Sequence, residues 1–154
     1  MLIVFLLICL GADALASFLT ARGVREWYPS LRKPSGTPPN WIFGPIWTTL
    51  YVLMAFSAWL VWRDYGWRGG GSALFIFFGQ LGLNIAWSGI FFGARLPGVA
   101  FAEIVLLWLA IAFTIVIFHW LTPLAALLLV PYFLWVAYAA YLNFSIWRLN
   151  RESV

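Results

Sequence analysis

Amide and indole side chains recur at helical spacing between residues 80 and 91. The set comprises Gln80, Asn84, Trp87, Ser88 and Phe91. Residues separated by four, seven, eight and eleven positions share one face of a helix, so these side chains form a continuous stripe. Amides in hydrocarbon need hydrogen-bond partners, which predicts that the stripe faces the interior of a helix bundle. Gln80 and Asn84 could either join helices together or contact a ligand, and the spacing leaves both roles open.

A second stripe occupies one helical face near the end of the chain. It comprises Trp135, Tyr138, Ala139, Leu142 and Asn143. A large indole beside a small residue and an amide is the layout of a flat pocket wall with a recess at Ala139. The alternative is ordinary packing, in which the small residue admits a neighbouring helix. We favour the pocket because residues 80–91 and 41–51 carry aromatic stripes that are counterparts of this one.

The segment Lys33–Tyr51 joins a proline-broken loop to an aromatic helix. Pro38 and Pro39 exclude helix before Trp41, because proline lacks an N–H donor and restricts the preceding residue to extended conformations. Trp47 and Tyr51 lie four residues apart and share one helical face. The segment therefore predicts a further aromatic wall that begins directly after a loop.

The elements that must position these stripes are transmembrane helices. The chain has 154 residues, of which 64% are hydrophobic and 9% charged, too few polar residues to coat a soluble globule. Apolar segments long enough for a bilayer core lie at about residues 2–21, 41–63, 72–92, 98–118 and 123–147. The sequence therefore predicts an all-α fold, a single domain over residues 1–154 built as an integral membrane bundle of five transmembrane helices.

The basic residues predict an orientation for this bundle. One face would collect seven of them, namely Arg22, Arg25, Arg32, Lys33, Arg95, Arg148 and Arg151, and the other face only Arg63 and Arg68. The positive-inside rule then places the N-terminus outside and the C-terminus in the cytoplasm of a bacterial cell membrane. The net charge of +4 reflects this topology and anionic lipid headgroups, and does not indicate a nucleic-acid partner.

Conventional catalytic and metal-binding groups are scarce. Cys9 is the single cysteine and His119 the single histidine, so we predict neither a disulfide framework nor a metal site. Asp13 would lie near the middle of the first helix, where a charge costs about 2.5–3.5 kcal/mol on insertion scales. A hydrogen bond to Ser17 is favoured there over a role in proton-linked transport. Glu103 is expected to be solvated by reaching the membrane interface.

Gly89 and Gly93 form a GxxxG motif on the segment 72–92. This spacing of small residues lets helix backbones approach closely. It predicts a close helix contact and suggests a dimer seam.

Several motifs taken together resemble the TspO/MBR family of tryptophan-rich sensory proteins. Besides Lys33–Tyr51, they are the Trp-Tyr pair at 27–28, Leu-Asn-Ile-Ala-Trp at 83–87, Phe-Phe-Gly-Ala-Arg at 91–95, and the Pro-Tyr, Trp, Leu-Asn, Trp-Arg and Asn pattern over 131–150. The resemblance implies a five-helix bundle, usually a homodimer, that binds tetrapyrroles such as protoporphyrin IX and haem, benzodiazepine-type or isoquinoline drugs and, in some members, sterols. No covalently attached cofactor is implied, and membrane lipid is the other expected partner.

The resemblance also implies a set of ligand-binding residues. With Tyr138 added from its stripe, the set is Trp41, Phe43, Trp47, Asn84, Trp87, Phe91, Trp135, Tyr138, Ala139, Leu142 and Asn143. Two positions depart from the family pattern. Gly36 replaces an aromatic residue of the first loop, which acts as a lid in the family, so restoring a ring there is expected to strengthen the lid. Phe144 replaces the tyrosine of a proposed sterol motif, so no sterol site is predicted.

Three functions follow as hypotheses. The first is a membrane receptor or regulatory protein for tetrapyrroles, linked to porphyrin metabolism or stress signalling, with a basic rim of Arg22, Arg25, Arg32 and Lys33 above the pocket. The second is a light- and oxygen-dependent enzyme that degrades protoporphyrin, with Trp47 and Trp135 as candidate catalytic residues. The third is a porphyrin or sterol transporter, disfavoured because the chain shows no inverted repeat.

Overall fold

Helices are the regular secondary structure of the part of the chain that the structure describes. The computed structural model describes residues 1–151, so residues 152–154, which close the predicted domain and carry the C-terminus, lie outside it. The elements are α1 (Leu2–Glu26), η1 (Tyr28–Ser30), α2 (Asn40–Ser88), η2 (Gly89–Gly93), α3 (Pro97–Leu121) and α4 (Pro123–Leu149). Proline opens both α3 and α4, where its missing N–H would have had no partner within the helix. The all-α prediction is confirmed.

The number of transmembrane helices differs from the prediction. Among residues 1–151, four helices are long and apolar enough to cross a membrane: Leu2–Glu26, Asn40–Gly93, Pro97–Leu121 and Pro123–Leu149. The predicted segments 41–63 and 72–92 both fall in α2, because helix continues through residues 64–71, where the sequence predicted a loop. Only Gly66 leaves the helical conformation inside α2, with φ 64° and ψ −168°. We call residues 40–65 the first arm of α2 and residues 67–88 the second arm.

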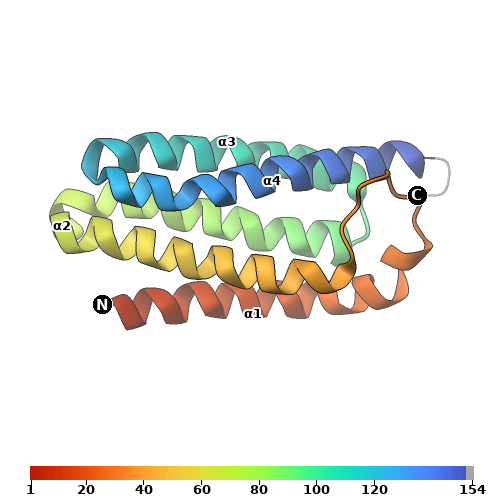
Figure 1. Ribbon diagram of the computed structural model, residues 1–154, viewed down its shortest axis with the longest axis horizontal. Helices are drawn as coiled ribbons and strands as arrows, with labels where there is room; N and C mark the ends of the chain where they lie inside the picture. Colours follow the sequence, from red (N-terminus) through yellow and green to blue (C-terminus); the bar gives the residue numbers. More distant parts are fainter. Residues whose placement is uncertain (152–154) are drawn as a thin grey trace.

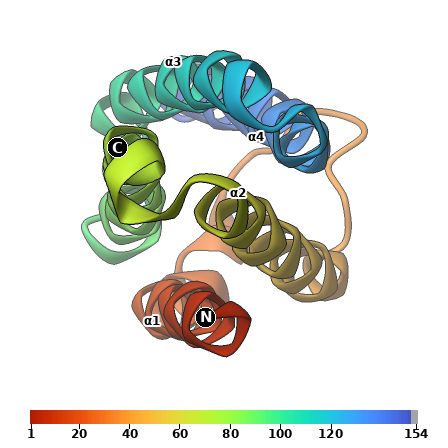
Figure 2. The same cartoon turned by 90° about the vertical axis from the view of Figure 1, so that its left-hand side faces the viewer.

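The chain forms one elongated bundle. At Gly66, α2 turns back on itself, so that its two arms run side by side (Figures 1 and 2). The pair α3 and α4 lies on one side of these arms, and α1 lies on the other (Figure 2). Met1 and the end of α4 lie at opposite ends of the long axis (Figure 1).

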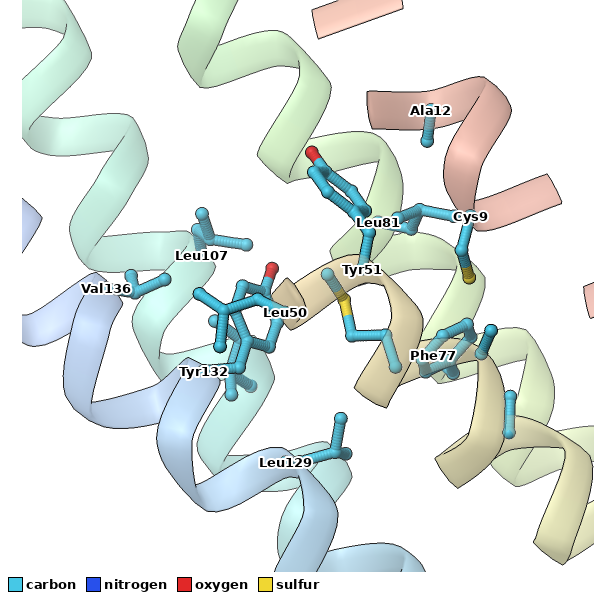
Figure 3. Packing of buried hydrophobic residues seen from close by; sticks show 14 of the residues in the cluster. Cys9, Ala12, Leu50, Tyr51, Phe77, Leu81, Leu107, Leu129, Tyr132 and Val136 are labelled. Carbon is cyan, nitrogen blue, oxygen red and sulfur yellow. The ribbon is translucent and has the colours of Figure 1, made fainter. Parts of the chain in front are cut away.

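Apolar side chains from every long helix meet in the core. Figure 3 shows Cys9 of α1, Tyr51 and Phe77 from the two arms of α2, Leu107 of α3 and Tyr132 of α4 converging there. Each of these side chains is at most 1% exposed. Aromatic pairs such as Phe77 and Phe118, with ring centroids 6.0 Å apart, join α2 to α3.

Polar groups fasten the turn of α2 to the turn between α3 and α4. The Thr122 hydroxyl donates to Asp64 Oδ2 at 3.0 Å, and Arg63 Nε pairs with Asp64 Oδ1 at 3.1 Å. The Tyr65 hydroxyl donates to the carbonyl oxygen of Leu121 at 2.7 Å. The bonds from Thr122 and Tyr65 hold the turn of α2 against the turn between α3 and α4.

The GxxxG glycines make their close contact within the chain. An added Cβ on Gly89 or Gly93 would lie 3.7 Å from atoms of Leu19 on α1. On the other side of this contact, a Cβ on Gly23 would lie 2.4 Å from the Phe92 carbonyl oxygen. The predicted close helix contact is therefore the packing of α1 against η2, and the suggested dimer seam at these glycines is replaced by it.

Candidate ligand-binding cavity

A cavity of about 410 Å³ lies between α1, both arms of α2, η2 and α4. One face of α1 contributes Asp13, Ala16, Ser17, Thr20, Ala21, Val24 and Arg25. The rest of the wall is Tyr28, Asn40, Phe43, Gly44, Trp47, Thr48, Tyr51, Asn84, Trp87, Ser88, Phe91, Phe92, Trp135, Ala139, Leu142, Asn143 and Ile146. The volume falls in the range of small-molecule sites, which are usually apolar with a few placed polar groups.

Indole rings from two helices form the aromatic wall. Trp47 of α2 and Trp135 of α4 meet edge to face, with ring centroids 6.4 Å apart and planes at 84°. Phe43, one turn earlier on α2, packs on Trp135 at 5.8 Å. Such pairs hold large rings in fixed orientations. A flat aromatic ligand would therefore meet rigid aromatic surfaces.

Asn84 sits at the centre of a buried hydrogen-bond network. Its Oδ1 accepts from the Tyr51 hydroxyl at 2.8 Å, and its Nδ2 donates to the Tyr132 hydroxyl oxygen at 2.7 Å. The Tyr132 hydroxyl in turn donates to Gln80 Oε1 at 2.7 Å. These bonds link both arms of α2 with α4, so the amides join helices, and Asn84 also borders the cavity.

Asn143 makes a second such junction. Its Oδ1 accepts from Trp87 Nε1 at 2.9 Å, and its Nδ2 donates to the Pro97 carbonyl oxygen at 2.7 Å. The Trp87 ring stacks on Phe91, with centroids 5.4 Å apart. The amide thus orients an indole of the cavity wall and ties α4 to the start of α3.

Trp135 supplies an unsatisfied donor. Its Nε1 is buried and has no hydrogen-bond partner among residues 1–151. A buried donor without a partner costs free energy. Beside it, Ala139 provides the small side chain of the predicted recess.

The structure brings together all the predicted ligand-binding residues except Trp41 and Tyr138. Trp41 is 72% exposed at the start of α2. The Tyr138 hydroxyl donates to the Gly36 carbonyl oxygen, so it fastens the first loop. Neither side chain forms part of the cavity wall.

The polar wall formed by α1 was missed by sequence reasoning. Its cavity residues recur every three or four positions from Asp13 to Arg25, a spacing that indicates one face of a helix.

Two expectations about acidic residues are wrong. Asp13 was expected to bond to Ser17, but its Oδ2 accepts a hydrogen bond from the Thr48 hydroxyl on α2 at 2.9 Å. Glu103 does not reach solvent as expected, since both carboxylate oxygens are buried and unpartnered within residues 1–151.

Gly36 is a turn residue of the first loop. Its φ of +87° lies in a region that side-chain-bearing residues rarely adopt. The position therefore requires glycine for its backbone conformation. A tryptophan there would strain the loop, so the expectation that a restored ring strengthens the lid loses its physical basis.

The end of the cavity near the first loop is basic. Of the predicted rim, Arg25 borders the cavity, while Arg22 pairs with Glu26 at 3.0 Å. The Lys33 ammonium lies 4.5 Å from the centre of the Tyr28 ring. Burial lowers the pKa of Lys33 and raises the pKa of Tyr28.

A helical bundle with bilayer-length apolar helices and an aromatic cavity between them defines an integral membrane protein of the small-molecule-binding type. The chain belongs to the TspO/MBR family, whose sequence profile matches residues 4–148.

Relatives from several lineages align over most of the chain. A translocator protein from Homo sapiens is 43% identical over 143 residues, covering 92% of this chain and 84% of the relative. A tryptophan-rich protein TspO from Archaeoglobus fulgidus is 41% identical over 150 residues, covering 97% and 96%. Protein CrtK from Rhodobacter capsulatus is 43% identical over 126 residues, covering 80% and 78%.

Proposed function

We propose that this chain is a membrane receptor or regulatory protein that binds a flat aromatic ligand in the cavity between α1, α2 and α4. The family resemblance implies tetrapyrroles such as protoporphyrin IX or haem, and benzodiazepine-type or isoquinoline compounds. The observation that carries the proposal is the aromatic wall, in which Trp47 and Trp135 are held 6.4 Å apart beside the recess at Ala139.

One polar group suits a tetrapyrrole in particular. Arg25 borders the cavity near the first loop, where it would pair with an anionic propionate. Trp135 would contribute the surface of its indole ring. Asn84 and Asn143 contribute differently, because their amide groups bond to protein partners. They would position the ring walls rather than bind the ligand directly.

A fluorescence titration tests this proposal. Protoporphyrin IX added to the purified protein in neutral detergent should quench tryptophan emission saturably. Trp135→Phe should weaken binding, because the variant loses part of the aromatic wall. Trp120→Phe is the matched control, since that indole is 75% exposed and outside the cavity wall. Non-saturable quenching, or equal affinity in both variants, would count against the cavity as the site.

Light-dependent degradation of bound protoporphyrin is a second candidate function. The observation that favours it is the contact between Trp47 and Trp135 in the cavity wall, which places oxidisable rings beside an excited ligand. Illumination in oxygen should then bleach the complex faster than free porphyrin. The excess should fall in Trp135→Phe, because phenylalanine is harder to oxidise, and persist in Trp120→Phe. Bleaching at the free-porphyrin rate would exclude this function.

We further propose a homodimer in a bacterial cell membrane with the N-terminus outside and the C-terminus in the cytoplasm. The orientation is supported by the basic residues near the first loop and at the end of α4, which the positive-inside rule assigns to the cytoplasmic side. The dimer rests on the family resemblance, and its interface would lie elsewhere than at Gly89 and Gly93, which pack against α1.

A further inference from the structure

Asp13 places a carboxylate in the wall of the cavity, halfway along α1. Its Oδ2 accepts one hydrogen bond, from the Thr48 hydroxyl at 2.9 Å. Within residues 1–151, no lysine, arginine or histidine side chain forms an ion pair with it. A carboxyl group without an ion-pair partner in this part of the chain therefore borders the cavity.

The carboxylate keeps most of its hydrogen-bonding capacity. A carboxylate group accepts about four hydrogen bonds, and Thr48 occupies one of these positions. Among residues 1–151, the bond from Thr48 is the one hydrogen bond that the Asp13 carboxylate receives. The remaining acceptor positions are available to a group inside the cavity.

The surroundings of Asp13 favour a cationic donor on an aromatic frame. Trp47 adjoins Thr48 in sequence and, with Tyr51, lines the cavity on the first arm of α2. Aromatic faces attract cations, and a carboxylate forms its strongest hydrogen bonds with charged N–H donors. Arg25 lies twelve residues further along α1, roughly 18 Å at 1.5 Å per residue, so the two opposite charges mark separate ends of the cavity.

We propose that Asp13 is a recognition group for a protonated amine, or another cationic N–H donor, carried by a flat aromatic ligand. This inference rests on the proposed function of the cavity and adds a specificity to it. The ligand's ring system lies against the aromatic wall, and its cationic nitrogen bonds to the free acceptor positions of Asp13. A neutral ring of the same shape lacks this interaction.

A matched pair of ligands and a matched pair of variants test the proposal. The ligands are 9-aminoacridine, a cation with N–H donors at neutral pH, and acridine, a neutral ring of the same shape. The variants are Asp13→Asn, which keeps an acceptor for Thr48 but removes the charge, and Asp64→Asn. Asp64 bonds to Thr122 and Arg63 outside the cavity, so its variant controls for the change in net charge.

In Asp13→Asn we expect the Kd for 9-aminoacridine in neutral detergent to rise about ten- to hundred-fold, the range for one hydrogen bond to a charged group. The Kd for acridine should change less than about two-fold, and Asp64→Asn should leave both values unchanged. Melting temperatures report folding, and Asp13→Ala carries the same expectation if the asparagine variant does not fold.

Equal loss of both ligands in Asp13→Asn, or no loss of 9-aminoacridine, would overturn the proposal. Saturable binding of protoporphyrin by a wild-type protein that does not bind 9-aminoacridine would also overturn it, while leaving the proposed function intact. A wild-type protein that binds none of the three compounds would instead refute the proposed function.

Discussion

Removing the bond between Tyr51 and Asn84 tests whether the buried polar network stabilises the bundle. The perturbation is a double-mutant cycle of Tyr51→Phe and Asn84→Leu. Both side chains are 1% exposed, and their bond of 2.8 Å joins the two arms of α2. Each single change leaves one polar atom buried without its partner.

The expected magnitudes follow from the pattern of bonds. Asn84→Leu leaves the Tyr51 hydroxyl without its acceptor, which costs about 1–3 kcal/mol of unfolding free energy. It costs less at Tyr132, because that hydroxyl still donates to Gln80 Oε1. Tyr51→Phe leaves Asn84 Oδ1 unpaired at a similar cost. The double variant removes both partners, so its loss should be smaller than the sum by about 1 kcal/mol, within the range measured for hydrogen bonds between membrane helices.

The assay is reversible unfolding in mixed micelles of rising dodecyl sulfate fraction, followed by tryptophan emission. The Kd for protoporphyrin is measured in parallel and should rise only about three-fold in Asn84→Leu, because both polar atoms of the amide bond to tyrosines. Losses that add up in the double variant would refute the network as a coupled unit. A Kd that rises a hundred-fold in a variant of normal stability would show that Asn84 binds the ligand directly.

Three further predictions concern the glycines and the topology. Gly36→Ala should lower unfolding free energy by about 1–2 kcal/mol, because alanine at a φ of +87° carries a left-handed strain; an unchanged melting temperature would contradict this. Gly23→Ala should destabilise the protein by about 2 kcal/mol or more, because its Cβ would lie 2.4 Å from the Phe92 carbonyl oxygen, whereas Gly11→Ala, with no neighbour within 4 Å, should not. A reporter that is active only outside the cytoplasm should be inactive when fused after residue 154, and high activity there would invert the proposed topology.

Periodicity predicted the parts of the cavity that lie along single helices. The stripes at residues 80–91 and 135–143 each place several members in the wall, because spacing alone decides which side chains share a helical face. The same logic was available for α1, where Asp13 begins a face of three- and four-residue steps. That face was not recognised because Asp13 and Arg25 were treated separately, the first as a buried acid and the second as part of a basic rim, and most of the residues between them are small.

Contacts between helices could not be predicted in this way. Thr48 lies 35 residues from Asp13, and no rule of local spacing pairs them. The continuation of helix around Gly66 was also missed, because glycine-rich sequence ordinarily indicates a loop. In this protein the turn needs a single residue outside the helical conformation.

The fastening of the first loop has a kinetic consequence. Residues 29–39 connect Tyr28 to Asn40, which both border the cavity. Three hydrogen bonds hold this connection to α4 and to the residue that follows it: two between Asn150 and the backbone of Arg32, and one from Tyr138 to Gly36. At about 1 kcal/mol each, these bonds favour the fastened loop over the released one. Where this loop acts as the lid that the family resemblance implies, its release would precede both the entry and the exit of a ligand, so the bonds would slow both steps by the same factor and leave the equilibrium constant unchanged. A ligand held beneath this loop would therefore have a long residence time even at modest affinity.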